Sequence, residues 1–260
     1  MKYAQLIIGL LAGTAIGGAV VVSAGNPLAG GSLKLGGGVD REEVKQIVRD
    51  TISEDPQFIL DSVNKFQQAK HQKDIDNASA MLKQQDVKDQ LYKFEDAAFV
   101  GPKDAKKVVV EFYDYDCPVC HTMFKGIDAL VSKNKDVKVI FREFPIFGPV
   151  SEQNSRIGIA VNHLYPEKYF KFHEKMMDGP GHNATEAKTL AVVKSLGMNP
   201  DKVKEEAAKP EVQATLDATR KLGEQLHIQG TPSLVIGEEL IPHAVSPEEL
   251  ESRVNALPAN

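Results

Sequence analysis

Two cysteines that stand three positions apart, Cys117 and Cys120, constrain this chain more than any other feature of its sequence. They are the only cysteines in 260 residues, and they follow closely on the apolar run over residues 107–113. A run of β-branched residues is typical of a buried strand, so the pair should lie at the start of the following helix. Two thiols within one Cys-x-x-Cys cannot tie distant parts of a fold together. The pattern therefore predicts a redox-active dithiol rather than a structural cross-link.

The composition limits the classes of partner and cofactor. With 260 residues, of which 42% are hydrophobic, the chain can fill a core without covalent help. The formal net charge is −5 and no basic segment stands out, so we expect no nucleic-acid partner. A zinc site needs about four ligands. The chain has no second cysteine pair and its histidines are scattered, so we expect neither a metal nor a cofactor.

The N-terminus reads as an export signal over residues 1–24, with an early lysine, a long apolar stretch and small residues up to Ala24. We expect cleavage after Ala24. The alternative is an uncleaved membrane anchor, because the apolar stretch approaches the roughly 20 residues that span a bilayer. Either case predicts a protein of the periplasm or cell envelope. Residues 25–38 are rich in glycine and are predicted to form a linker.

The following segment, residues 39–95, is highly charged and carries apolar residues at helical spacing from Val44 to Leu82. It predicts two or three amphipathic helices, with breaks near Asp55 and Gln85. So thin an apolar stripe cannot form a core alone, and it must be buried on the next domain or on a second copy of the chain. A solvated helical spacer is the other interpretation. We predict an oligomerisation region.

Residues 96–260 have the pattern of an α/β domain. Strands are predicted before and after the helix that begins at the cysteines, and two more lie near the C-terminus ahead of a last helix. Between the two pairs of strands, residues 151–226 carry only helical signals and are predicted to be a helical insert. The expected strands are 107–113, 137–144, 233–236 and 239–241, and the flanking helices are 117–133 and a helix from Ser246.

The predicted position of the cysteines gives them different roles. A thiol reacts as its thiolate, and a helix N-terminus stabilises negative charge. Cys117 is therefore expected to be the exposed nucleophile with a low pKa, and Cys120 the buried thiol that resolves the mixed disulfide. Glu111 lies in the preceding strand, where burial should raise its pKa and let it exchange a proton with Cys120. The alternative for Glu111 is a sheet edge or a salt bridge.

Three polar residues beside the cysteines are not expected to take part in the chemistry. Asp114 and Asp116 would oppose a thiolate by like charge, so we expect both to point to solvent. His121 is expected to be exposed in the first turn of the helix.

The combination of Glu111-Phe112, Cys117-Pro118-Val119-Cys120 and a distant Gly230-Thr231-Pro232 resembles the DsbA family of bacterial envelope disulfide oxidoreductases. The resemblance covers about residues 99–254 and implies a thioredoxin fold. It also implies that Pro232 is a cis proline facing the cysteines and that Thr231 offers backbone groups to a bound peptide. Pro118 and Val119 are expected to contact the same peptide.

Two features depart from a monomeric oxidase of that family. Position 119 is valine, where the best-known member has a histidine, so Cys117 is expected to be a weaker oxidant. Thr231 and the helical segment before Tyr92 are similar to the dimeric isomerases of the DsbC kind and to a subgroup of DsbA-like proteins with an N-terminal helical oligomerisation region. The resemblance thus implies a homodimer or a trimer, with the dimer favoured, that forms or isomerises disulfides in reduced or misoxidised exported proteins. It also implies a membrane redox partner of the DsbB or DsbD type.

Two other functions fit parts of the sequence. Residues 117–121 also match the Cys-x-x-Cys-His motif of c-type haem attachment, which would make the chain an electron carrier. An envelope chaperone or binding module could keep the same fold and use its groove without the thiols.

Overall fold

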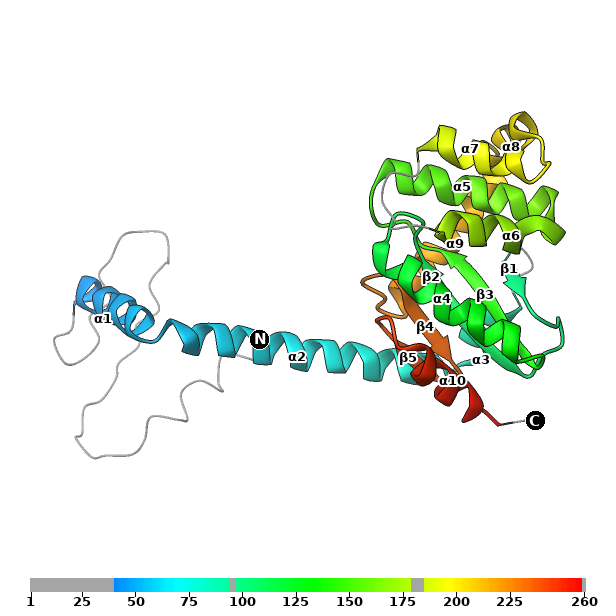
Figure 1. Ribbon diagram of the computed structural model, residues 1–260. Helices are drawn as coiled ribbons and strands as arrows, with labels where there is room; N and C mark the ends of the chain where they lie inside the picture. The colour runs from blue at the N-terminus through cyan, green and yellow to red at the C-terminus, as the bar shows by residue number, and fades with distance from the viewer. Residues whose placement is uncertain (1–39, 94–96, 179–184, 259–260) are drawn as a thin grey trace. The chain divides into compact units, whose positions relative to one another are not determined.

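The computed structural model describes residues 40–93, 97–178 and 185–258 (Figure 1). The chain divides into two units between Ala69 and Lys70. The predicted export signal and glycine-rich linker, residues 1–38, lie outside the described residues. Within the described ranges, no helix is both long enough and apolar enough to cross a membrane.

The first unit contains α1, Arg41–Glu54, and the beginning of α2, Pro56–Met81. Asp40 caps α1 by accepting a hydrogen bond from the N–H of Glu42, and α1 and α2 meet at Asp55, as predicted. No residue of α1 is buried. Large apolar side chains remain exposed along both helices, namely Ile47, Val48, Ile52, Phe58, Ile59, Leu60, Val63 and Phe66.

The second unit is built on a five-stranded sheet in the order β1-β3-β2-β4-β5. The central pair, β2 and β3, is parallel, and every other neighbouring pair is antiparallel. The strands are β1 (Ala98–Val100), β2 (Lys107–Tyr113), β3 (Val137–Glu143), β4 (Ser233–Ile236) and β5 (Glu239–Ile241). The four predicted strands are present to within one residue. The short edge strand β1 was not predicted.

Helices cover both faces of this sheet (Figure 1). One face carries α4, Pro118–Lys133, and α10, Pro247–Asn255, and the other carries α3, Gln85–Tyr92, and α9, Pro210–Gln225. Successive strand residues point to opposite faces. In β2, Val109 and Tyr113 therefore join the core below α4, whereas Val110 and Phe112 join the core below α3 and α9. The predicted thioredoxin fold is confirmed.

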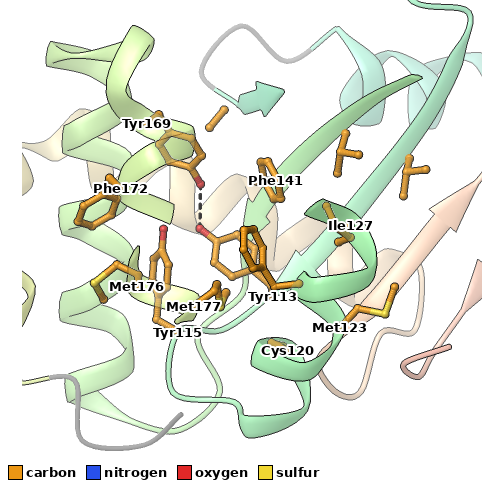
Figure 2. Close-up of a cluster of buried hydrophobic side chains, with 14 of the residues drawn as sticks. Tyr113, Tyr115, Cys120, Met123, Ile127, Phe141, Tyr169, Phe172, Met176 and Met177 are labelled. Atoms are coloured by element: carbon orange, nitrogen blue, oxygen red, sulfur yellow. Dashed lines mark hydrogen bonds between the residues drawn. The ribbon is translucent and has the colours of Figure 1, made fainter. Parts of the chain in front are cut away.

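The predicted helical insert lies between β3 and β4. It consists of α5 (Pro149–Leu164), α6 (Pro166–Met177), α7 (Glu186–Ser195), α8 (Pro200–Ala207) and α9. All of these helices except α7 begin with proline, a residue that fits the first helical position. These prolines allowed most of the boundaries between the helices to be predicted from the sequence. Where α6 meets the sheet, Tyr113, Tyr169 and Phe141 form part of a buried aromatic cluster (Figure 2).

The predicted helical region 39–95 is shared between the two units. From Lys70 onward its residues belong to the second unit, where four apolar side chains are almost completely buried: Ala78, Leu82, Val87 and Leu91. They join the core on the α3 and α9 face of the sheet. The Tyr92 hydroxyl donates a hydrogen bond to the carbonyl of Gly237 at 2.9 Å, which fastens α3 to the turn between β4 and β5. The end of α2 and all of α3 thus contribute to the core of the second unit.

Candidate active site

The two cysteines lie where β2 gives way to α4. Cys117 is the N-cap of α4 and Pro118 occupies its first turn, as the sequence indicates. The Cys117 carbonyl accepts hydrogen bonds from the N–H groups of Cys120, at 3.0 Å, and His121, at 3.3 Å. Both cysteines are free thiols. The junction between strand and helix that the sequence predicts is therefore present.

The surroundings shift the pKa values of the two thiols in opposite directions. A hydrogen bond from the Cys120 thiol is the largest cause that lowers the pKa of Cys117 to about 5. Smaller contributions come from the Thr231 side chain and from the backbone N–H groups of Cys120 and Val119, while burial acts against them. Burial, the hydrogen bond to Cys117 and the charge of Glu111 raise the pKa of Cys120 above its ordinary value. At neutral pH the site therefore holds a Cys117 thiolate and a Cys120 thiol.

The expected exposure of Cys117 is wrong. Only 2% of Cys117 is accessible, little more than the 0% of Cys120, while Val119 between them is 48% exposed. The segment before β4 covers the sulfur, and the Cys117 thiol, when protonated, donates to the Thr231 carbonyl at 3.2 Å. The two cysteines thus differ in pKa far more than in accessibility.

The peptide bond between Thr231 and Pro232 is cis, as the resemblance implies. Pro232 is buried and Thr231 is half-buried. The hydroxyl of Ser233 donates to the Gly230 carbonyl at 2.8 Å, which closes the turn that presents this segment to Cys117. Thr231 is therefore beside the reactive sulfur. Its contact with a bound peptide remains a prediction, as do those of Pro118 and Val119.

Glu111 is buried at the centre of the sheet, with only 1% of the residue exposed. On β2 it pairs with Phe141 of β3 on one side and Leu234 of β4 on the other. Neither carboxyl oxygen has a hydrogen-bond partner among the described residues. Burial, and then the charge of Cys117, raise the pKa of Glu111 to about 8. The alternative placement at a sheet edge or in a salt bridge is wrong.

The expectation that Asp114 and Asp116 point to solvent is also wrong. Asp114 is fully buried, and its carboxylate accepts hydrogen bonds from the N–H groups of Asp116, Ile146 and Phe147 and from the Ser151 hydroxyl. Asp116 is 6% exposed. Asp114 therefore joins the cysteine loop to the start of the helical insert. The bond to a residue two positions on is an Asx turn, which an Asp-x-Asp after a strand could have indicated.

His121 is 5% exposed, contrary to the expected surface position. Its Nε2 is 2.8 Å from the Tyr115 carbonyl and its Nδ1 is 3.0 Å from the Met177 carbonyl. The ring therefore does not present a nitrogen to a haem iron, which disfavours the electron-carrier interpretation. Met177 lies 56 positions along the chain, and no local pattern indicated that it would meet His121.

Paired thiols with pKa values shifted in opposite directions, held on a thioredoxin fold, define a thiol–disulfide oxidoreductase. Residues 108–255 match the family described as the DSBA-like thioredoxin domain, and the chain belongs to this family. Residues 40–73 match the N-terminal domain of copper resistance protein ScsC.

Relatives cover both parts of the chain. Disulfide bond formation protein D of Bacillus subtilis is 25% identical over 164 residues, which are 60% of this chain and 74% of that protein. The structure of Proteus mirabilis ScsC in a transitional conformation is 28% identical with a TM-score of 0.61, and it covers 82% of this chain and 94% of that chain. A periplasmic thioredoxin-like protein from Salmonella enterica serovar Typhimurium is 27% identical with a TM-score of 0.61, covering 66% of this chain and 95% of its own.

Proposed function

We propose that this protein forms and isomerises disulfides in exported proteins of the periplasm or cell envelope, and that it acts as a homodimer. The observation that carries the proposal is the set of eight large apolar side chains that α1 and α2 leave exposed in the first unit. An oxidase that works alone has no use for such a surface. A second copy of the chain would bury it and bring two dithiol sites into one assembly.

The chemistry follows from the two pKa values. In isomerisation, the Cys117 thiolate attacks one sulfur of a wrong client disulfide, which forms a mixed disulfide and releases a client thiolate. A client thiolate then attacks the mixed disulfide, forms a new client disulfide and frees Cys117, so no electrons are gained or lost. In oxidation, the Cys117–Cys120 disulfide takes two electrons from a client dithiol. A DsbB- or DsbD-type membrane partner would restore the redox state that each reaction needs.

We assign Glu111 the role of a proton carrier for Cys120. To resolve a mixed disulfide, the Cys120 thiol must lose its proton in a buried place where its pKa is raised. Glu111 lies on the strand that leads to the cysteines, and its pKa of about 8 lets it hold or release a proton near neutral pH. The ionised Glu111 carboxylate accepts the Cys120 proton as the Cys120 thiolate forms, and its raised pKa makes it a stronger base for this transfer than an ordinary carboxylate.

The client would bind over the covered sulfur of Cys117. The carbonyl of Thr231, which precedes Pro232, lies 3.2 Å from this sulfur, and the half-buried Pro118 and exposed Val119 follow Cys117 in the chain. An extended peptide could take the place of the Cys117 contact with the Thr231 carbonyl. These four residues fit a site that recognises the backbone of many sequences, since only Val119 offers a large exposed side chain.

The apolar surface of the first unit favours a second copy as its partner. Phe58 is 63% exposed and Phe66 is 67% exposed, and both lie on α2. Burying such a side chain contributes about 1.5–3 kcal/mol, so several together can hold a dimer. The charged residues that surround the apolar positions would remain in water at the rim of that interface.

The test compares the wild-type chain with the double variant Phe58→Ser/Phe66→Ser. We expect the variant to be a monomer by light scattering, to oxidise a reduced client as fast as the wild type, and to lose most recovery of scrambled ribonuclease. The control is Leu164→Ser, which alters an exposed apolar residue of the second unit. A variant that becomes monomeric yet recovers scrambled ribonuclease fully would refute the proposed link.

The same assays separate this function from a chaperone or binding module. Replacing both Cys117 and Cys120 by alanine should abolish oxidation and isomerisation together. If the double alanine variant retained the activity on scrambled ribonuclease, the thiols would not be the working groups, and the binding-module interpretation would replace ours.

A further inference from the structure

The buried side chain of His121 has an unusual pair of neighbours. Both ring nitrogens lie within hydrogen-bond distance of backbone carbonyl oxygens, Nε2 at 2.8 Å from that of Tyr115 and Nδ1 at 3.0 Å from that of Met177. A carbonyl oxygen can only accept a hydrogen bond. Each ring nitrogen therefore faces an acceptor.

A neutral imidazole cannot satisfy this arrangement. It carries a proton on one nitrogen and a lone pair on the other, so one contact would bring a lone pair against a carbonyl oxygen at 3.0 Å or less. With both nitrogens protonated, the imidazolium donates to both carbonyls. A hydrogen bond from a charged donor is also stronger than one from a neutral donor.

The position of Met177 supplies a further reason for a positive charge. It is the last residue of α6, and the last four carbonyls of a helix have no partner within the helix. These carbonyls form the negative end of the helix dipole, where a cation is stabilised. His121 therefore caps α6 from another element, and the cap compensates for the burial of a charged ring.

The protonation of His121 depends on the groups around it. His173 of α6 is fully buried, and burial first, then the charge of His121, lower its pKa to about 3. His173 is therefore neutral, with the Tyr115 hydroxyl 3.2 Å from its Nδ1. Other ionisable groups near His121 in the chain are Asp114, Tyr115, Asp116 and Cys117 of the loop and Cys120 and the exposed Lys125 of α4. Those near Met177 are Glu174 and Lys175 of α6 and Asp178, which follows it.

We propose that His121 is a buried imidazolium, and that its charge, one helical turn from Cys117, stabilises the thiolate form of the reduced site. Reduction of the Cys117–Cys120 disulfide takes two electrons and one proton, and it leaves a thiolate on Cys117 and a thiol on Cys120. A client dithiol supplies both electrons and two protons, of which one remains on Cys120 and one goes to water. The charge of His121 favours this product and makes the disulfide a stronger oxidant.

The protonation state can be read directly from the wild-type protein. In the reduced, full-length protein labelled with nitrogen-15, we expect the ring nitrogens of His121 to give the signals of an imidazolium at pH 7. The variant His121→Gln identifies these signals by their loss. His71, which is exposed on α2, gives the comparison signals of a surface histidine. A ring of His121 with one unprotonated nitrogen at pH 7 would overturn the proposal, whether or not any variant folds.

The effect on the dithiol is tested with matched variants. Against glutathione, His121→Gln should lower the equilibrium constant for reduction of the disulfide at least tenfold, which corresponds to about 30 mV. His121→Lys keeps the charge and should recover most of this loss, whereas His71→Gln should change nothing. A folded Gln variant with an equilibrium constant within twofold of the wild type would also overturn the proposal.

These measurements rest on the dithiol chemistry of Cys117 but not on isomerisation or on the dimer. A chain that proved to be a monomeric oxidase would give the same signals from His121 and the same loss in His121→Gln. The two proposals can therefore fail separately.

Discussion

Replacing Glu111 by glutamine should stabilise the folded protein, and the gain should grow with pH. Glutamine has nearly the shape of the protonated acid and cannot ionise. The folded chain keeps the Glu111 proton up to a pKa of about 8, while the unfolded chain releases it near the ordinary value of 4.5. Between these two values the unfolded state binds fewer protons, so the wild-type protein loses stability as pH rises.

The size of the effect follows from the same two values. From pH 4.5 to pH 7 the wild-type protein loses about 1.4 kcal/mol per pH unit, which gives about 3 kcal/mol at pH 7. The loss reaches its full value above pH 8 and vanishes below pH 4.5. Glu111→Gln removes it, so the two proteins should have equal stability at low pH and separate as pH increases.

Urea denaturation of the reduced proteins between pH 5 and pH 8 measures this difference. The Cys117 thiolate is present in both proteins, so the difference between the two curves isolates the carboxyl group. Glu224→Gln changes an exposed glutamate of α9 and should follow the wild type at every pH. A difference between wild type and Glu111→Gln that does not change with pH would refute the reasoning.

Three further substitutions test other contacts of the second unit. Cys120→Ala should raise the pKa of Cys117 from about 5 toward its ordinary 9.0, because it removes the largest cause of the shift. Cys120→Ser keeps a hydrogen-bond donor beside Cys117 and should raise the pKa of Cys117 less. Titration of the thiolate absorbance in the ultraviolet measures this pKa in both variants, and equal pKa shifts would contradict the prediction. Leu91→Ala should cost about 2–5 kcal/mol in urea denaturation, and the exposed Leu164→Ala of the same unit should cost much less. Equal losses would show that α3 lies outside the core. Asp114→Ala leaves four donors without their acceptor and should cost at least about 3 kcal/mol by the same assay; a loss typical of a surface substitution would count against its structural role.

The sheet and the placement of the dithiol could be predicted because local patterns determine them. The run Lys107–Tyr113 is apolar at nearly every position, as a central strand requires, and a turn and a helix start follow it directly. Strand β1 escaped prediction because three residues at an edge show no period. Alternation cannot be recognised over Ala98–Val100, and its pairing with β3 is a tertiary contact.

The surroundings of the cysteines were predicted less well, since distant segments form them. Asp114 and His121 looked like surface residues because their local contacts, with Asp116 and Tyr115, do not indicate burial by themselves. Their other partners lie in and just before the first turn of α5 and at the end of α6, more than 30 positions away. In the same way, the sequence showed the apolar positions at helical spacing in residues 39–95. It did not show which surface would bury them. The structure places the last part of this segment on the sheet, so a truncation at Tyr92 would uncover a core that a truncation at Lys70 leaves closed.

The cover over Cys117 has a consequence for the lifetime of the protein. A thiolate is the form that peroxides convert to sulfenic acid and then, irreversibly, to sulfinic and sulfonic acids. With a pKa of about 5, Cys117 is in this vulnerable form throughout the physiological range. Because only 2% of the residue is accessible, an oxidant in solution has little surface to attack. The segment around Thr231 thus shields the thiolate from oxidants, and under the proposed function a bound client would displace it only when the thiolate is needed.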